Sequence, residues 1–292
     1  MSGWKLFTSA WEWHPSVVAG CALLLGGYLA AVRCRINRCT LFFAAGVIAT
    51  LLALVSPLDP LGDDYLFSAH MLQHILLDMV APPLFILGLP AEPMRRLLRW
   101  PPLSAVERVL GQPVLAWWLG TGTLCVWHLP VLFNAALASE GVHIFQHLTF
   151  LVTGTIMWWP VFGPLEERRM TPMTSVVYLL LASVPNAILG IFFTFAGTSF
   201  YAAYAQPEDE LGALALIRDS WGLDPVTDQQ LGGAIMWVLG SIIYFWAILA
   251  AVARWFLEPG TEEEWPPESL MKAPGDGAGQ SRGSGKLNSK GM

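Results

Sequence analysis

The sequence predicts an all-α integral membrane protein, a bundle of seven transmembrane helices, and two observations carry this prediction. Of the 292 residues, 54% are hydrophobic and only 13% are charged, whereas about a quarter of the residues in a typical soluble domain are charged. Apolar runs of membrane-spanning length also recur along the chain. Windows of about 19 residues place the spans at 16–32, 40–56, 66–88, 113–133, 142–160, 173–196 and 231–256.

The spans differ in the polar residues that interrupt them. The first two are almost wholly apolar and are joined by the basic turn "CRINRC". The third contains "SAHMLQHILLDMVAPP", the fourth ends near "WHLPVLF", and the fifth begins with "HIFQH". The sixth carries Pro185 and Asn186 at mid-depth, and the seventh follows "TDQQLGG". Glycine and proline within these runs are compatible with the assignment, because transmembrane helices tolerate them better than soluble helices do.

Positive charge in the connecting segments sets the predicted direction. Basic residues follow spans one, three and five and end span seven: Arg33, Arg35, Arg38, Arg95, Arg96, Arg99, Arg108, Arg168, Arg169 and Arg254. The opposite set of loops holds only Lys5 and Arg218. Because cytoplasmic loops are enriched in lysine and arginine, the N-terminus is predicted outside and the C-terminus in the cytoplasm. Residues 1–257 form the predicted transmembrane domain, and 258–292 a disordered cytoplasmic tail rich in Pro, Gly, Ser and charge.

Histidine placement predicts a metal site near the outer surface. His70/His74 open the third span and His143/His147 the fifth, and i, i+4 spacing puts both rings of a pair on one helix face. Two such helices side by side can surround one ion or two. His128 lies at the outer end of the fourth span. Asp228, at the start of the seventh, is placed to supply an anionic ligand, with a helix N-cap as its alternative role. The predicted ligands are His70, His74, His128, His143, His147 and Asp228.

The other polar residues of the spans receive more modest interpretations. His14 is expected to be structural, Cys125 to be a buried structural thiol, and Met71, Met79 and Met236 to be packing residues. Pro82 and Pro83 should free backbone carbonyls near Asp78 and kink the third span. Asp78 itself is a functional candidate, because an intramembrane carboxylate is costly, and Asn186 is its expected partner.

At these residues the chain resembles the seven-helix CtaG family, membrane-embedded assembly factors of caa-type cytochrome c oxidase. The blocks that carry the resemblance are "SAHMLQHILLDMVAPPLFILGLP", "WHLPVLFNAAL", "HIFQHLTFLVTGTIMWWPV" and "DQQLGGAIMW", in order from about Trp13 to Trp255. The resemblance implies a multi-pass protein of the bacterial plasma membrane that assembles a haem–copper oxidase, binding or delivering copper, with no catalytic turnover. Its implied partners are oxidase subunits, periplasmic copper chaperones and membrane lipid. The five histidines of the predicted ligand set and Asp228 fall on the family's polar positions, whereas Asp78 departs from the family's pattern.

Two other functions remain open at this point. A membrane hydrolase would hold zinc through about three of these ligands and leave a position for water. A haem-binding electron-transfer protein would use two imidazoles on facing helices. Calcium and magnesium are disfavoured, because only one carboxylate accompanies the histidines. Nucleic acid is excluded as a partner, since the sequence has no basic face or recognised motif.

Overall fold

The computed structural model describes residues 3–257, and within that range every regular element is a helix. The predicted tail, 258–292, lies outside the described residues. The long elements are α2 (Pro15–Ala31), α3 (Arg38–Val55), α9 (Pro113–Trp127), α11 (Glu140–Phe162), α12 (Pro172–Thr194) and α13 (Pro225–Leu257). The shorter ones are α1 (Gly3–Ser9), α4 (Leu58–Pro60), η1 (Leu61–Tyr65), α5 (Phe67–Ile75), η2 (Leu76–Val80), α6 (Ala81–Leu87), α7 (Ala91–Leu97), α8 (Pro101–Leu110), α10 (Pro130–Ala138), η3 (Glu166–Arg168), η4 (Ala202–Tyr204) and η5 (Leu216–Ser220).

Several of these helices are suited to a bilayer, which makes the chain a membrane protein. Four helices are long and apolar enough to cross a membrane: Arg38–Val55, Phe67–Leu87, Pro172–Thr194 and Pro225–Leu257. The number of spans rises to five if α8 and α9, which are bent by 68° relative to each other, count as one span. Helix α2 coincides with the first predicted span but has only 17 residues. Helix α11 has 23 residues, and its histidines and Gln146 lower its hydropathy. A count of seven spans and their direction therefore stay predictions.

The predicted fourth span, 113–133, is corrected by the structure. Helix α9 ends at Trp127, and a separate helix, α10, begins at Pro130. The reason is local: a proline lacks the N–H that would continue the helix and disfavours the helical conformation in the residue before it. Leu129 is accordingly extended, with φ −66° and ψ 129°. His128 therefore lies at a helix end, where its side chain is freer to turn into the bundle.

The carbonyl that Pro82 was predicted to free is present in the third span, while the predicted kink stays a prediction. Between α5 and α6 the backbone forms the π-helical segment η2 directly before Pro82 and Pro83. Pro82 has no N–H to offer the carbonyl of Asp78. The indole Nε1 of Trp158, on α11, donates to that carbonyl instead, over 3.2 Å. The freed acceptor is thus satisfied by the neighbouring helix, as burial in an apolar core requires.

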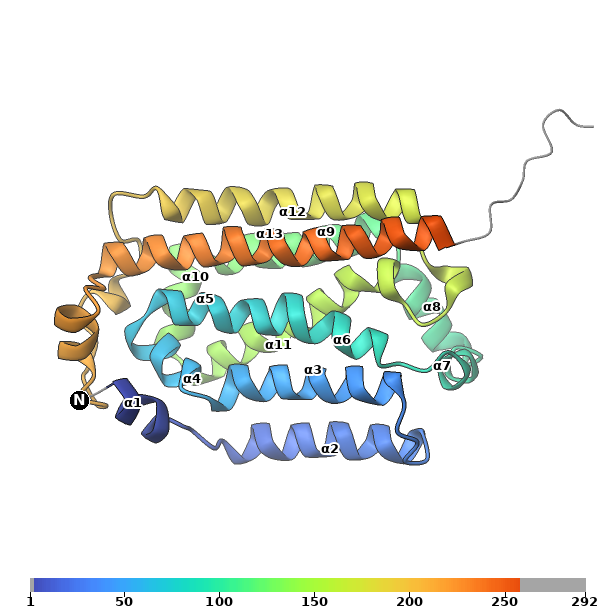
Figure 1. Cartoon of the computed structure of the whole chain (residues 1–292), viewed down its shortest axis with the longest axis horizontal. Helices are drawn as coiled ribbons and strands as arrows, with labels where there is room; N and C mark the ends of the chain where they lie inside the picture. The colour runs from blue at the N-terminus through green and yellow to red at the C-terminus, as the bar shows by residue number, and fades with distance from the viewer. Residues whose placement is uncertain (1–2, 258–292) are drawn as a thin grey trace, which may run out of the picture. The chain divides into compact units, whose positions relative to one another are not determined.

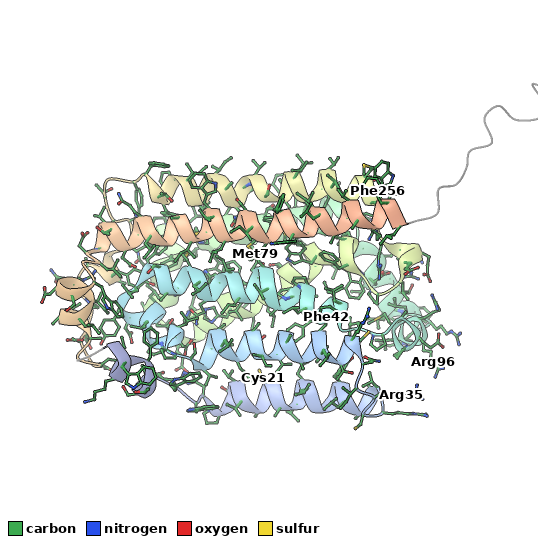
Figure 2. All side chains as sticks on the ribbon, viewed as in Figure 1. Cys21, Arg35, Phe42, Met79, Arg96 and Phe256 are labelled. Carbon is green, nitrogen blue, oxygen red and sulfur yellow. The ribbon has the colours of Figure 1, made fainter. Side chains whose placement is uncertain are left out.

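The two ends of the bundle differ in charge and covering. In Figure 1, α2 and α3 lie along one side of the bundle and α12 and α13 along the other, with α5 and α6 between them, and α1 and η5 are at one end and α7 at the other. Arg35 and Arg96 lie at the end opposite α1 (Figure 2). At the α1 end, Leu6, Tyr65 and Ile217 belong to one buried apolar cluster. The short segments at this end therefore cover the start of α5, where the predicted histidine site begins.

Candidate metal centre

Five histidines from three helices come together at the start of α5 and α11. Their ring centroids are 4.2 Å apart for His70 and His74, 4.1 Å for His143 and His147, and 5.3 Å for His70 and His143. His128, at the end of α9, has its ring 6.0 Å from that of His74. The structure thus assembles all five predicted histidine ligands in one place, from positions up to 77 residues apart in the chain.

Among the described residues, three sets could offer ligand atoms to one ion, and two of them share His70. The deep group is His70, His74 and His147, all buried, with one ring nitrogen of each within 4.8 Å of the others. The rim group is Asp63, His70 and His143, whose possible ligand atoms also lie within 4.8 Å of one another. The rim group is more open: the side chain of Asp63 is 31% exposed and that of His143 12%, while His70 is fully buried. An ion can therefore contact a carboxylate at the rim and imidazole alone in the deep group.

Hydrogen bonds determine which nitrogen each ring offers. Nδ1 of His70 lies 3.3 Å from the carbonyl oxygen of Gly62, and Nδ1 of His143 lies 3.2 Å from Oδ2 of Asp63. A carbonyl and a carboxylate only accept hydrogen bonds, so we assign the proton of each neutral ring to Nδ1. In a neutral ring Nε2 then presents a lone pair. Most metal-binding histidines share this arrangement: Nδ1–H donates to an oxygen, and the Nε2 lone pair is available to the metal.

The lone pairs of these histidines have no protein partner. Among the described residues, the Nε2 atoms of His70, His143 and His147 are buried without a hydrogen bond, and so are both nitrogens of His74. A buried polar atom left unsatisfied costs roughly 1–3 kcal/mol, so several in one cluster call for a binding partner. The donor set fits a metal ion. Imidazole suits copper and zinc, and a single nearby carboxylate does not suit calcium or magnesium.

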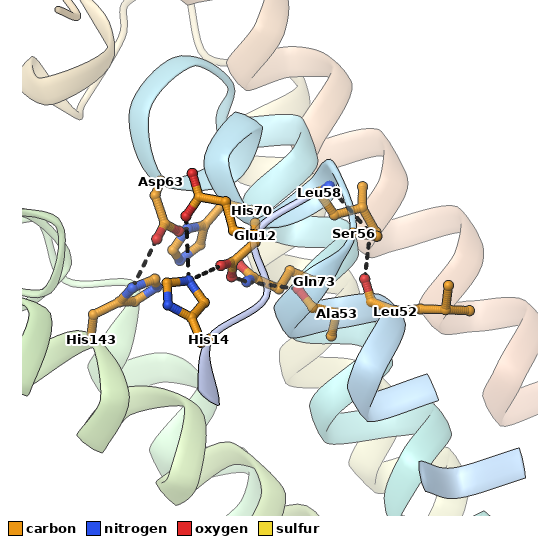
Figure 3. A network of polar contacts seen from close by, with 11 residues as sticks. Glu12, His14, Leu52, Ala53, Ser56, Leu58, Asp63, His70, Gln73 and His143 are labelled. Carbon is orange, nitrogen blue, oxygen red and sulfur yellow. Dashed lines mark hydrogen bonds and ion pairs between the residues drawn. The ribbon is translucent and has the colours of Figure 1, made fainter. Parts of the chain in front are cut away.

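Asp63 is the site residue that the sequence analysis missed. It lies in η1, which passes so close to α5 that a β-carbon on Gly62 would be 2.9 Å from the backbone nitrogen of His70. This close approach brings the carboxylate between His70 and His143, as Figure 3 shows. The one available signal was its position in "GDDY", just before the third span and on the same predicted side as the histidines.

Asp228 caps a helix, and its role as a metal ligand stays a prediction. Its buried carboxylate accepts hydrogen bonds from the backbone N–H of Phe67 at 2.7 Å, the backbone N–H of Ser68 at 3.2 Å and the Ser68 hydroxyl at 2.5 Å. It belongs to neither the rim group nor the deep group. A capping role was the alternative considered for it, but the helix it caps is α5 rather than its own. The start of α13 is served by Asp224, which accepts from Val226 and Thr227.

A surface network lies beside the rim group. His14 Nε2 is 3.3 Å from Glu12 Oε2 and 3.2 Å from Asp59 Oδ2, and Gln73 donates to Asp59 Oδ1 over 2.7 Å (Figure 3). Burial, together with the negative charge of Asp63, raises the pKa of Asp59 to about 7. Glu12, His14 and Asp59 form the third set of possible ligand atoms, so the structural role expected for His14 stays a prediction.

The remaining predicted residues are Asp78 and Asn186, which line a cavity, and Cys125, which is exposed. Asp78 and Asn186 line one cavity of about 10 Å³ beneath His74, close to the size of a single water. They do not form the expected pair: Asn186 donates to the carbonyl of Met236 over 3.0 Å, and Oδ1 of Asp78 has no hydrogen-bond partner among the described residues. Cys125 is exposed, which corrects the expectation of a buried thiol. On α9 the inward positions are taken by its neighbours Leu124 and His128.

Comparison with known proteins gives one family and several uncharacterized relatives. Residues 26–258 match the family model described as cytochrome c oxidase caa3 assembly factor (Caa3_CtaG). The chain is 25% identical over 273 residues to uncharacterized proteins of Mycobacterium bovis and Mycobacterium tuberculosis, covering 85% of this chain and 39% of each relative. An uncharacterized protein of Mycobacterium leprae is 26% identical over 274 residues, with 85% and 40% covered. The chain thus spans about two fifths of the length of these relatives. No solved structure matches it.

Proposed function

This chain belongs to the cytochrome c oxidase caa3 assembly factor family, and from that premise we propose that it binds copper as cargo and delivers it to an oxidase subunit. The observation that carries the proposal is the set of unpartnered ring nitrogens on His70, His74, His143 and His147. The predicted direction puts them in the outer leaflet of the bacterial plasma membrane, on the side where a periplasmic copper chaperone would arrive. Copper here is a substrate that enters and leaves.

The two groups suggest a route for the ion. A cation approaching from water first meets the partly exposed carboxylate of Asp63, with His143 behind it. His70 belongs to both groups, so its imidazole can take part in holding the ion both at the rim and in the deep group. Binding that proceeds through shared ligands keeps the ion from being released to the apolar surroundings. The same sequence in reverse would release copper to an oxidase subunit docked at the rim.

The test is the double substitution His70→Ala with His74→Ala. Each change removes a polar group from an apolar helix, so insertion into the membrane should not suffer. We expect the variant to accumulate near the wild-type level without its copper, and the oxidase of the same cells to be made but copper-deficient and inactive. His14→Ala, at a histidine already paired with Glu12 and Asp59, is the control and should do much less. Normal oxidase copper beside a stable double variant would remove the basis of the proposal.

A zinc-dependent membrane hydrolase is the second candidate. Three imidazoles within reach of one ion, with a carboxylate nearby, also resemble the ligands and base of a catalytic zinc site. Metal analysis of the purified protein separates the two: zinc together with hydrolysis of a lipid ester or amide would favour the enzyme. Haem is less well supported, because the cavity next to the cluster, about 10 Å³, is close to the size of a single water and far too small for a porphyrin.

A further inference from the structure

The contact between His128 and Met71 sets this histidine apart from the other four. Nε2 of His128 lies 3.2 Å from the sulfur of Met71, on α5. Nδ1 of the same ring lies 2.7 Å from the carbonyl oxygen of Leu124. Both side chains are buried, Met71 completely. His128 is outside the deep and rim groups, so its nitrogen is available to a separate position.

The contact between His128 and Met71 is unusual because no hydrogen atom is available to lie between the two side chains. The carbonyl of Leu124 can only accept, so the ring proton of a neutral His128 is on Nδ1. Nε2 then holds a lone pair, and the thioether sulfur that faces it has lone pairs and no proton. Two electron-pair donors thus lie 3.2 Å apart with no hydrogen between them. A cation bound by both would turn this contact into a favourable one, and the Nδ1–H bond to a carbonyl is the usual support of a metal-bound histidine.

The space next to this pair is lined by more soft ligands. The small cavity below the histidine cluster is bordered by Met71, Met79, Met236, His74 and His128. Three of the ten methionines of the chain therefore surround a single cavity. His74 also belongs to the deep group, and both of its nitrogens lack a partner among the described residues. The cavity and the deep group thus share one imidazole, that of His74.

We infer that this cavity is a second metal position, specific for monovalent copper, in which Met71 and His128 are ligands and His74 connects it to the deep group. The inference rests on the proposed copper function and deepens it by naming the oxidation state. Thioether sulfur is a soft ligand that selects Cu(I), whereas zinc accepts imidazole and carboxylate readily. Asp78 is the one carboxylate that lines this cavity, beside three thioethers, so we expect Cu(I) to bind in the cavity and Zn²⁺ to prefer the rim and deep groups. Met79 and Met236, whose side chains border the same space, are the further thioethers within the cavity.

The experiment uses the purified full-length protein in detergent. Cu(I) affinity is measured under reducing conditions by competition with a colorimetric Cu(I) chelator, and X-ray absorption of the copper-loaded wild type reports its ligand atoms. Met71→Leu keeps the volume of the side chain and removes the sulfur. Met157→Leu is the matched control, because Met157 is also buried but does not border the cavity. Zn²⁺ binding is measured on the same three proteins.

We expect the wild type to show a sulfur scatterer at about 2.3 Å, a usual metal–sulfur distance. Met71→Leu should lose it and bind Cu(I) at least roughly 10- to 100-fold more weakly, the range seen when even an outer-shell partner is lost. Zn²⁺ binding and Met157→Leu should match the wild type. A wild-type spectrum without sulfur, or unchanged Cu(I) affinity in Met71→Leu, would overturn the second position and leave the histidine groups standing. A wild type that binds no copper in either oxidation state would instead overturn the proposed function.

Discussion

Replacing Asp228 with asparagine separates a capping role from a metal-binding role. The carboxylate on α13 receives the backbone N–H groups of Phe67 and Ser68 and the Ser68 hydroxyl, at 2.7, 3.2 and 2.5 Å. Asparagine keeps the shape but turns one acceptor oxygen into an NH₂ group. That group would face donors, so at least one buried N–H loses its acceptor. The negative charge at the start of α5 is lost as well.

The size of the effect follows from these two losses. A buried donor without an acceptor costs about 1–3 kcal/mol. Removing a negative charge from a helix N-terminus costs roughly 0.3–1 kcal/mol, and up to about 2 in a partly buried setting. We therefore expect Asp228→Asn to lower the free energy of unfolding by about 2–4 kcal/mol. Since Asp228 lies in neither the rim nor the deep group, the metal content of the folded variant should not change.

Asp224→Asn provides a matched control on the same helix. Asp224 also accepts three hydrogen bonds, from Val226 N–H, Thr227 N–H and the Thr227 hydroxyl, but it is exposed. Water can replace lost bonds there, and asparagine is as good an N-cap as aspartate, so we expect a change below about 0.5 kcal/mol. Both variants are unfolded in detergent by heat, with loss of helix followed by circular dichroism. Equal stability of the two variants, or loss of metal without loss of stability in Asp228→Asn, would refute the capping argument.

Three further predictions follow from the packing and from the predicted direction. Gly154→Ala should lower the free energy of unfolding by about 1–3 kcal/mol, because a β-carbon there would lie 2.6 Å from the Asp78 carbonyl oxygen and 2.7 Å from Asp78 Oδ1. Gly122→Ala is the control and should not lower it, because a β-carbon there has no described heavy atom within 4 Å. Equal melting curves for the two variants would contradict the close contact at Gly154. Asp78→Asn should keep its metal stoichiometry, because Asp78 belongs to neither histidine group and, although it lines the cavity, is not one of the ligands proposed there; loss of all bound metal would make it a ligand. A reporter fused after residue 205 should be external and one after residue 260 cytoplasmic, and the reverse pattern would move every histidine to the inner side.

Local sequence determined the helices and the faces they present. Composition and apolar run length predicted an all-helical membrane protein, because a bilayer-spanning segment must satisfy its own backbone. Spacing of four residues placed His70 with His74 and His143 with His147, because an α-helix returns to the same face after one turn. Pro82 and Pro83 predicted the irregular backbone seen in η2, since proline acts on the carbonyl one turn before it. Each of these results depends on neighbours within a few residues.

Only the tertiary structure decided which polar groups meet. Asp63 reaches the histidines because η1 passes close to α5, and a loop path has no periodicity from which to predict it. Asp228 caps α5 because α13 packs beside the start of that helix, about 160 residues away in the chain. Met71 faces His128 because α9 ends before Pro130 and the imidazole of His128, the residue after the helix, turns inward. Sequence spacing determines the face of a single helix, whereas the packing of side chains between helices determines which faces come into contact.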